Sequence, residues 1–338
     1  MYPSKKSARA VFVKNQIDDI ANVGIDFLRV VKTKKARIFY LTFFLKSIFY
    51  LLFSSYDVIH AHYGFHSAFF PALIKRRPLV ISFHRGDALD EPRRNWLYCK
   101  SQKFVVRRSD HLIAVSDEIK QALIHDLGAT EDRVSIVSCG INTSVFTPLD
   151  KIEIREKLGI SQDCKMVLFV GQLIRRKGLD IVLECARRMR DVTFFIIGEG
   201  KFLKEEILKT ENCVFVGKVP NDEIPQWMNA ADVFFLPSRS EGTPLVFSEA
   251  LSCGLPAVVS DVGGCSAVVA DTDLAKYVVA PDDVETFHER LSELMENPSQ
   301  RKEVGKEGRD IILNKFAGKK IAQDIKDIYL KVCKNKNI

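Results

Sequence analysis

Two glutamates, Glu241 and Glu249, lie in the part of this sequence that is densest in groups able to hold an anionic ligand. That segment, residues 237–264, begins where the apolar run DVFFLPS, residues 232–238, ends. In open α/β sheets ligands bind at the carboxyl ends of the strands, so this position favours a binding site. On one continuous helix the two carboxylates would lie two turns apart and about 80° around the axis. An E-x7-E spacing also describes many solvated helix faces, and both interpretations stay open on spacing alone.

The residues that follow Glu241 predict a helix start. Gly242 allows a turn, Thr243 offers a capping hydroxyl, and Pro244 suits the first helical position. The free backbone N–H groups of such a first turn form an anion site.

A second candidate element is VGQLIRRKG, residues 170–178, which follows the apolar run MVLFVG and precedes a helical pattern. Lys177, together with Arg175 or Arg176, has the charge and reach to clamp a diphosphate through charge-assisted hydrogen bonds. In isolation an RRK triplet would be read as solvated surface charge. Its place at a strand end, opposite another anion site, favours the binding role.

The elements that must position these residues are visible as short apolar runs without alternation, separated by helical patterns. Such runs predict strands of parallel sheets covered on both faces. They occupy residues 57–62, 78–83, 111–116, 133–138, 166–171, 193–198, 213–217, 232–238 and 256–260. A break within residues 143–152 predicts two doubly wound domains, and a last helix at residues 319–333 carries an apolar stripe of Ile321, Ile325, Ile328 and Val332.

Composition and charge narrow the class of protein. The chain has 338 residues, 46% of them hydrophobic and 28% charged, which predicts a globular enzyme of two domains. Eight scattered cysteines without a C-x-x-C pair, and no signal-peptide pattern, predict a cytoplasmic location. Residues 1–150 hold 22 Lys and Arg against 14 Asp and Glu, so the basic excess lies in the first half and predicts an anionic partner there. The basic residues are not interleaved with aromatics in a recognisable module, so we expect no nucleic acid.

One segment of the basic half, IFYLTFFLKSIFYLLF at residues 38–53, is long, apolar and aromatic. It is too short to span a bilayer comfortably and follows a cationic cluster at Arg29, Lys32, Lys34, Lys35 and Arg37. Two interpretations are open. Either the helix lies on an anionic membrane surface, which makes the protein peripheral on the inner membrane face, or it is a core helix of the first domain.

Taken together, these stretches resemble glycosyltransferase family 4, the retaining enzymes of the two-domain GT-B fold. The resemblance runs from YPS and FVKNQI through DVIHAHYG, FHRGD and AVS, and is most specific in residues 237–264. It implies two Rossmann-like domains facing across a cleft. The acceptor-side domain would span residues 1–147, with its first strand apparently missing; the donor domain would span 148–318, and a helix at 319–338 would pack back on the first domain.

The resemblance also implies roles for residues. Glu241 would contact the donor sugar and Glu249 the ribose, while Lys177 and the backbone of Thr243 to Leu245 would hold the phosphates. His84 would lie near the transferred sugar with Asp87 beside it, and Gly171 and Gly198 would line the donor loops. A lone histidine after a strand is otherwise more often structural.

The expected substrates are a UDP- or GDP-sugar donor and a glycan or lipid-linked acceptor, with a role in cell-surface polysaccharide synthesis. No cofactor and no metal are expected. Asp271-Thr272-Asp273 has the spacing of a metal-binding acidic motif but is predicted to be a turn. His60, His62 and His66 suggest zinc, yet the family pattern makes this region a core strand and loop.

The sequence departs from the family pattern at three places. Gln172 replaces the usual arginine, Cys139-Gly140-Ile141-Asn142 replaces the usual Asn-Gly-Val-Asp, and Ala267 replaces an acid. Arg175 or Arg176 would compensate for Gln172. Two alternatives to transfer stay open at this point, a nucleotide-sugar epimerase of the same fold and an inactive nucleotide-sugar-binding subunit.

Overall fold

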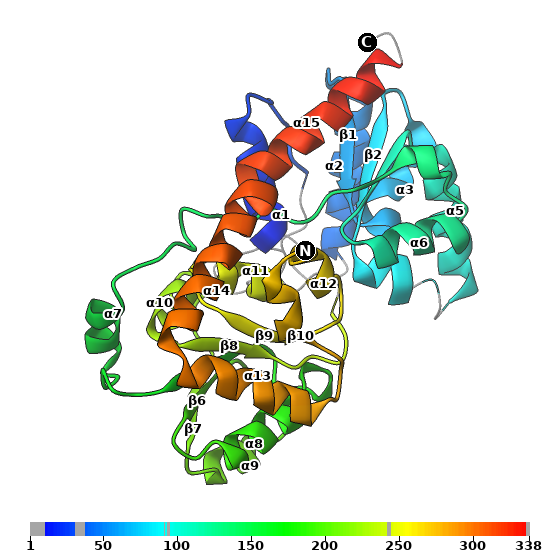
Figure 1. Cartoon of the computed structure of the whole chain (residues 1–338). Helices are drawn as coiled ribbons and strands as arrows, with labels where there is room; N and C mark the ends of the chain where they lie inside the picture. The colour runs from blue at the N-terminus through cyan, green and yellow to red at the C-terminus, as the bar shows by residue number, and fades with distance from the viewer. Residues whose placement is uncertain (1–10, 31–37, 91, 93–94, 242–244, 336–338) are drawn as a thin grey trace. The chain divides into compact units, whose positions relative to one another are not determined.

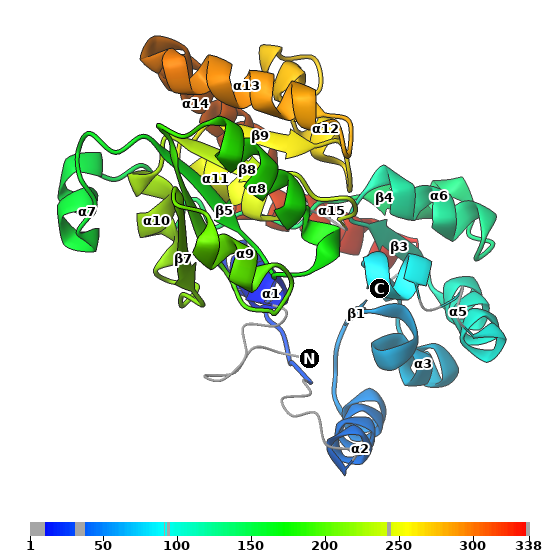
Figure 2. The same cartoon turned by 90° about the horizontal axis from the view of Figure 1, so that it is seen from below.

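The computed structural model describes residues 11–30, 38–90, 92, 95–241 and 245–335. The chain forms two compact units: unit 1 comprises residues 1–140 and 318–338, and unit 2 comprises residues 141–317. Each has its own parallel β-sheet with helices packed against it, which confirms the predicted α/β class with two parallel sheets (Figures 1 and 2).

The chain enters unit 2 earlier than the border that the sequence suggested at residues 147/148. Ile141 pairs with Ala317 in a parallel bridge, and the carbonyl oxygen of Phe146 accepts a hydrogen bond from the Ser252 hydroxyl. The segment around Pro148 therefore packs on unit 2 and does not link the two units.

Unit 1 contains a sheet of strand order β1-β2-β3-β4, in which every neighbouring pair is parallel. Its strands are β1 (Ile59–His62), β2 (Leu79–Phe83), β3 (His111–Ala114) and β4 (Val134–Ile136). Its helices are α1 (Val11–Asn22), α2 (Ile38–Phe53), α3 (Gly64–Ile74), α5 (Trp96–Arg108), α6 (Asp117–His125) and α15 (Gly318–Lys334), with a π-helical turn η1 (Gly86–Asp90) and a 3-10 turn η2 (Glu131–Arg133). All five residues of β2 are buried, as a central strand covered on both faces requires.

Helix α15 completes unit 1, although it comes from the other end of the chain. Figure 1 shows it, in red, beside α1. Its buried stripe confirms the predicted periodicity and packs with Val80 of β2, Ile113 of β3 and Ile20 of α1. The buried positions are Ile321, Ile325, Ile328 and Val332. The Tyr329 hydroxyl also lies 2.5 Å from Nδ1 of His60, which ties α15 to β1.

Unit 2 contains a parallel sheet of strand order β10-β9-β8-β5-β6-β7. Its strands are β5 (Met166–Val170), β6 (Thr193–Ile197), β7 (Cys213–Gly217), β8 (Val233–Leu236), β9 (Ala257–Ser260) and β10 (Val278–Val279). Its helices are α7 (Lys151–Leu158), α8 (Leu179–Arg188), α9 (Lys204–Lys209), α10 (Ile224–Ala230), α11 (Leu245–Ser252), α12 (Cys265–Val268), α13 (Val284–Glu296) and α14 (Pro298–Ile311), with short turns η3 (Arg175–Lys177), η4 (Asp273–Tyr277) and η5 (Ile312–Phe316). From β5 the chain winds outward through β6 and β7, and then in the other direction through β8, β9 and β10. The strand order therefore reverses between β5 and β8.

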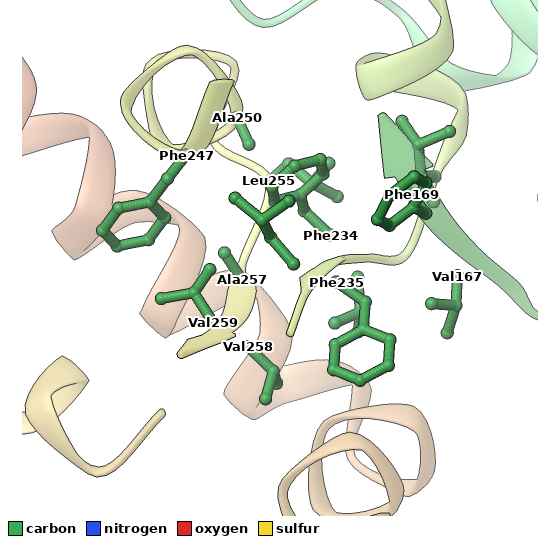
Figure 3. Packing of buried hydrophobic residues seen from close by; sticks show 14 of the residues in the cluster. Val167, Phe169, Phe234, Phe235, Phe247, Ala250, Leu255, Ala257, Val258 and Val259 are labelled. Atoms are coloured by element: carbon green, nitrogen blue, oxygen red, sulfur yellow. The ribbon is translucent and has the colours of Figure 1, made fainter. Parts of the chain in front are cut away.

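The core of unit 2 explains why its strands are apolar throughout. Phe234 and Phe235 of β8 are both fully buried, and successive strand side chains point to opposite faces. Figure 3 shows Phe234 close to Leu255. Phe235 meets Phe287 of α13 on the other face, with ring centroids 5.4 Å apart. Both faces of β8 are thus covered, so the strand has no polar side.

None of the helices in the described ranges combines the length and the apolar character needed to cross a bilayer.

Because α15 supplies a large part of the core of unit 1, we expect Ile325→Ala to lower the free energy of unfolding by about 2–4 kcal/mol. Ile325 is fully buried, whereas Leu330 on the same helix is exposed and provides a matched control. Leu330→Ala should change stability by less than about 0.5 kcal/mol. Urea denaturation followed by circular dichroism measures both, and equal losses for the two variants would contradict the packing of α15.

Candidate functional site

Two of the predicted site residues, Lys177 and Glu241, lie at the carboxyl edge of the unit 2 sheet, where the strand order reverses. Lys177 follows β5, and Glu241 follows β8, the strand beside it. In doubly wound sheets the crossovers leave this point in opposite directions, and ligands bind there. Residues 64 positions apart in the sequence are thereby brought together.

Two of the predicted glycines allow the loops after β5 and β6 to touch. The N–H of Gly171 donates to the Ile197 carbonyl oxygen over 2.9 Å. Gly198 has φ +153°, and a Cβ on it would lie 1.7 Å from the carbonyl oxygen of Gly171. A side chain at position 198 would separate the two loops, so glycine is required there.

The turn η3 is held against the loop after β8 by Arg239. The Arg239 N–H donates to the Arg176 carbonyl oxygen over 2.8 Å, and Nη1 donates to the Arg175 carbonyl oxygen over 2.9 Å. The guanidinium also pairs with both carboxylate oxygens of Asp180, at 2.9 and 2.7 Å, and with Asp282 at 2.7 Å. Its hydrogen bonds to Asp180 raise the pKa of Arg239 further above its ordinary value. Arg239 therefore fixes the backbone that carries the predicted phosphate-binding residues.

Within η3 the three basic residues differ in position. Arg175 and Arg176 are exposed, whereas Lys177 points inward and its Nζ lies 2.5 Å from Oε1 of Glu241. The side chains of this pair are only 14% and 9% exposed. A lysine ammonium has three donors, so Lys177 can hold Glu241 and still donate to a phosphate oxygen. The structure thus joins two residues whose roles were predicted separately.

Glu241 is also fixed on its backbone side by the loop after β9. Gly263 has φ +60°, and a Cβ there would lie 2.8 Å from the backbone of Glu241. The loops after β5, β8 and β9 consequently form one packed edge.

The predicted angular relation between Glu241 and Glu249 is wrong. Glu241 lies in a loop, and α11 begins at Leu245, so a rotation of 100° per residue does not apply between the two glutamates. Gly242, Thr243 and Pro244, the predicted helix start, fall outside the described residues. Glu249 lies within α11 and is half-buried, and desolvation raises the pKa of its carboxyl group to about 7.

In unit 1, His84 follows β2 and is buried. Asp87 lies beside it and joins two strand ends: Oδ1 accepts from the His84 N–H and Oδ2 from the Gly64 N–H, both over 2.8 Å. Desolvation, with a smaller effect from His62, lowers the pKa of His84 to about 3. His84 is therefore a neutral imidazole at physiological pH, able to exchange hydrogen bonds but not to act as a cation.

Two histidines of the zinc interpretation, His60 and His66, serve as hydrogen-bonding partners. Nε2 of His60 lies 2.8 Å from the Ser82 hydroxyl, in addition to its contact with Tyr329, and Nε2 of His66 lies 2.5 Å from the Tyr98 hydroxyl. In the described parts of the chain no group of three His, Cys, Asp or Glu residues has the geometry of a metal site. Asp271 lies in a turn with φ +61°, as predicted, and does not end a strand.

Comparison with known proteins decides the family. The profile of glycosyltransferase family 4 matches residues 9–145, and that of glycosyl transferases group 1 matches residues 150–311. The chain belongs to glycosyltransferase family 4. It is thus a glycosyltransferase of the GT-B type.

Curated relatives of this family 4 protein cover most of its length. It is 29% identical over 290 residues to the uncharacterized glycosyltransferase MJ1178 of Methanocaldococcus jannaschii, covering 81% of this chain and 75% of the relative. It is 31% identical to the putative teichuronic acid biosynthesis glycosyltransferase TuaC of Bacillus subtilis, covering 63% of this chain and 55% of TuaC. It is 31% identical to the D-inositol 3-phosphate glycosyltransferase of Streptosporangium roseum, covering 73% of this chain and 63% of that relative. The chain spans less than two thirds of the length of the last two relatives.

Solved structures confirm the fold. The sucrose-phosphate synthase of Thermosynechococcus elongatus superposes with a TM-score of 0.78 at 19% identity, covering 96% of this chain and 93% of that one. Anabaena HepE in complex with UDP superposes with a TM-score of 0.74 at 20% identity, covering 88% of this chain and 85% of HepE.

The raised pKa of Glu249 predicts a pH-dependent stability. The carboxyl group binds its proton more tightly in the folded than in the unfolded chain, so its contribution is present below pH 4.5 and is lost as the pH rises to about 7. We expect Glu249→Gln to make unit 2 less sensitive to pH across that window. Denaturation midpoints from pH 4.5 to 7.5 measure the effect, with the exposed Glu303→Gln of α14 as the control. Parallel pH curves for Glu249→Gln and the parent protein would contradict it.

Proposed function

We propose that this family 4 protein is a retaining glycosyltransferase that binds a nucleotide diphosphate sugar in unit 2 and transfers the sugar to a glycan or lipid-linked acceptor bound by unit 1. The observation that carries the proposal is the inward Lys177–Glu241 pair at the reversal of strand order, held in place by Arg239. This edge combines a cation, a carboxylate and closely packed glycine loops. Those are the groups that a diphosphate and a sugar require.

In this proposal Lys177, with Arg175 and Arg176, stabilises the negative charge that develops on the departing diphosphate. Preorganised charges aimed at a developing anion are among the largest contributions to catalysis. Because these cations come from the protein, the reaction requires no divalent metal. The acceptor hydroxyl attacks the anomeric carbon from the face that the diphosphate leaves, and neutral His84 hydrogen-bonds a hydroxyl of the transferred sugar. Glu249 binds the ribose of the donor.

The comparisons support the nature of the substrates. Structures of HepE are described in complex with UDP and with UDP-glucose, which favours a uridine donor over GDP for this chain. The name of TuaC supports a role in a cell-surface polysaccharide. Such polymers are assembled on membrane-bound acceptors, so we place the protein in the cytoplasm, peripheral to the membrane.

The decisive experiment combines ligand binding with product analysis. We expect UDP-glucose or a related UDP-sugar to raise the melting temperature, since a ligand at 100 times its Kd adds about 2.7 kcal/mol of stability. When a UDP-sugar with a labelled sugar is incubated with the protein and an extract that contains the acceptor, the label should be transferred to the acceptor both with and without EDTA. An isomerised sugar without an acceptor would indicate an epimerase, and a thermal shift without turnover would indicate an inactive binding subunit. Activity lost in EDTA and restored by Mn²⁺ would contradict metal independence.

Glu241 and Glu249 should differ in their kinetic effects. Glu241→Ala removes a sugar contact that strengthens in the transition state, and we expect kcat to fall about 100-fold. Glu249→Ala removes a contact that is equal in ground and transition states, and we expect KM for the donor to rise about tenfold with kcat nearly unchanged. Glu303→Ala on α14 is the matched control. Unchanged kinetics in both site variants would refute the site assignment.

A further inference from the structure

Helix α2 of unit 1 leaves an apolar stripe exposed. Leu45, Phe49 and Phe53 are spaced four residues apart and lie on one side of the helix. Their side chains are 59%, 56% and 74% exposed. The rings of Phe49 and Phe53 lie 5.2 Å apart, so the two form a continuous apolar surface.

The opposite side of α2 anchors the helix in unit 1. Phe44 packs against Phe70 of α3, with ring centroids 4.8 Å apart, and Leu51 is buried. The helix is therefore partly a core element, as one interpretation of the sequence held, but its outer stripe has no partner among the described residues of unit 1. Contiguous exposed apolar surface of this kind marks an interaction site.

The charge of the surrounding helices indicates what that site meets. Helix α2, helix α3 with residues 75–77 after it, and helix α5 contain eight basic residues and no acidic residue. Three of the eight contact other groups of the fold: Lys75 lies 2.7 Å from Asp110, Arg108 donates to the Ala72 carbonyl oxygen, and Arg76 donates to the Leu52 carbonyl oxygen. Within the described parts of the chain, six of the eight form no ion pair: Lys46, Arg76, Arg77, Lys100, Lys103 and Arg107. Six cations that form no ion pair within the described fold favour an anionic partner.

The exposed face of α5 repeats the combination of apolar and basic groups. Trp96, Lys100, Lys103 and Arg107 fall on one side of the helix, and Trp96 is 71% exposed. Tryptophan prefers the boundary between hydrocarbon and headgroups, where its ring is apolar and its N–H is solvated. Both views place α3 between α2 and α5 in unit 1.

At the end of α2 the apolar and cationic groups share one groove. An open groove of about 460 Å³ is lined by Phe53, Ser54, Ser55, Arg76 and Arg77, among others. Nη1 of Arg76 donates to the Leu52 carbonyl oxygen over 2.9 Å, which fixes the arginine beside the aromatic ring. An acyl chain against Phe53 and a phosphate against the arginines would satisfy both parts.

We propose that these helices form a surface that docks on an anionic lipid bilayer. We call it the α2–α5 surface, and define it by Leu45, Lys46, Phe49, Phe53, Leu73, Arg76, Arg77, Trp96, Lys100, Lys103 and Arg107. A nucleic acid would match the cations but not the Leu45–Phe53 stripe, whereas a bilayer matches both. The inference rests on the part of the proposed function that places the acceptor at a membrane. Its test measures vesicle binding and no sugar transfer.

The test is co-sedimentation of the full chain with vesicles of phosphatidylcholine alone or mixed with phosphatidylglycerol. We expect binding only to the anionic vesicles, weakened by high salt. Each basic residue near such a surface contributes on the order of a fivefold change in partitioning, so Lys100→Glu with Lys103→Glu and Arg107→Glu should lower it about 100-fold or more. Phe49→Ser with Phe53→Ser should lower it about tenfold or more, because two large apolar side chains no longer enter the boundary. All five positions are exposed, so the variants should fold.

Matched controls come from unit 2. Lys302→Glu with Lys306→Glu and Lys315→Glu alters three exposed lysines by the same charge, and Ile152→Ser with Leu208→Ser alters two exposed apolar residues. Both controls should retain most of the binding, and the UDP-sugar thermal shift should be unchanged in every variant, which separates this proposal from the donor site. Equal losses in the controls, or no anionic preference in the parent protein, would overturn the proposal. So would a parent dimer that does not bind vesicles and becomes a monomer in the Phe49→Ser, Phe53→Ser variant, because the stripe would then join two copies of the chain.

Discussion

The reversal of strand order between β5 and β8 is the constraint on which the proposed donor site depends. Parallel strands need crossovers, and those from β5 and β8 leave in opposite directions, so neither covers the carboxyl ends of the two strands. Lys177 and Glu241 meet there because each directly follows one of these strands. Arg239 then fixes their relative position, because it donates hydrogen bonds to the carbonyl oxygens of Arg175 and Arg176 in the turn that carries Lys177. A flexible loop at the same place would offer the same charges without their alignment.

The two units differ in their electrostatic character at the strand ends. In unit 2 the side chains of Lys177 and Glu241 form an ion pair in a mostly buried place, where each partner compensates for the desolvation of the other. In unit 1 desolvation lowers the pKa values of the imidazoles of His60, His62 and His84, which are therefore neutral. One strand edge is thus suited to a charged ligand such as a diphosphate, and the other to neutral hydroxyl groups.

Much of this fold could be predicted from the sequence because buried parallel strands have no polar side. Each of the nine apolar runs contains a strand of the structure, and the stripe of α15 followed from its helical period. Strand β10, only Val278–Val279, is too short to produce a recognisable run. The role of Arg239 was missed because its partners Asp180 and Asp282 lie 59 and 43 residues away, and tertiary packing alone brings them together. The error over Glu241 arose because a helical rotation was applied to a residue that precedes the predicted helix start and lies in a loop.

The discontinuity of unit 1 has a consequence for how the protein is made. Unit 2 is one continuous stretch, residues 141–317, inserted between the two parts of unit 1. A ribosome therefore synthesises all of unit 2 before it reaches α15. Until residues 318–334 have been synthesised, Val80 and Ile113 lack the helix that packs against them. Part of the core of unit 1 is then open to solvent. The unit that is begun first is thus the last to complete its core, and until then its exposed apolar surface is prone to aggregation.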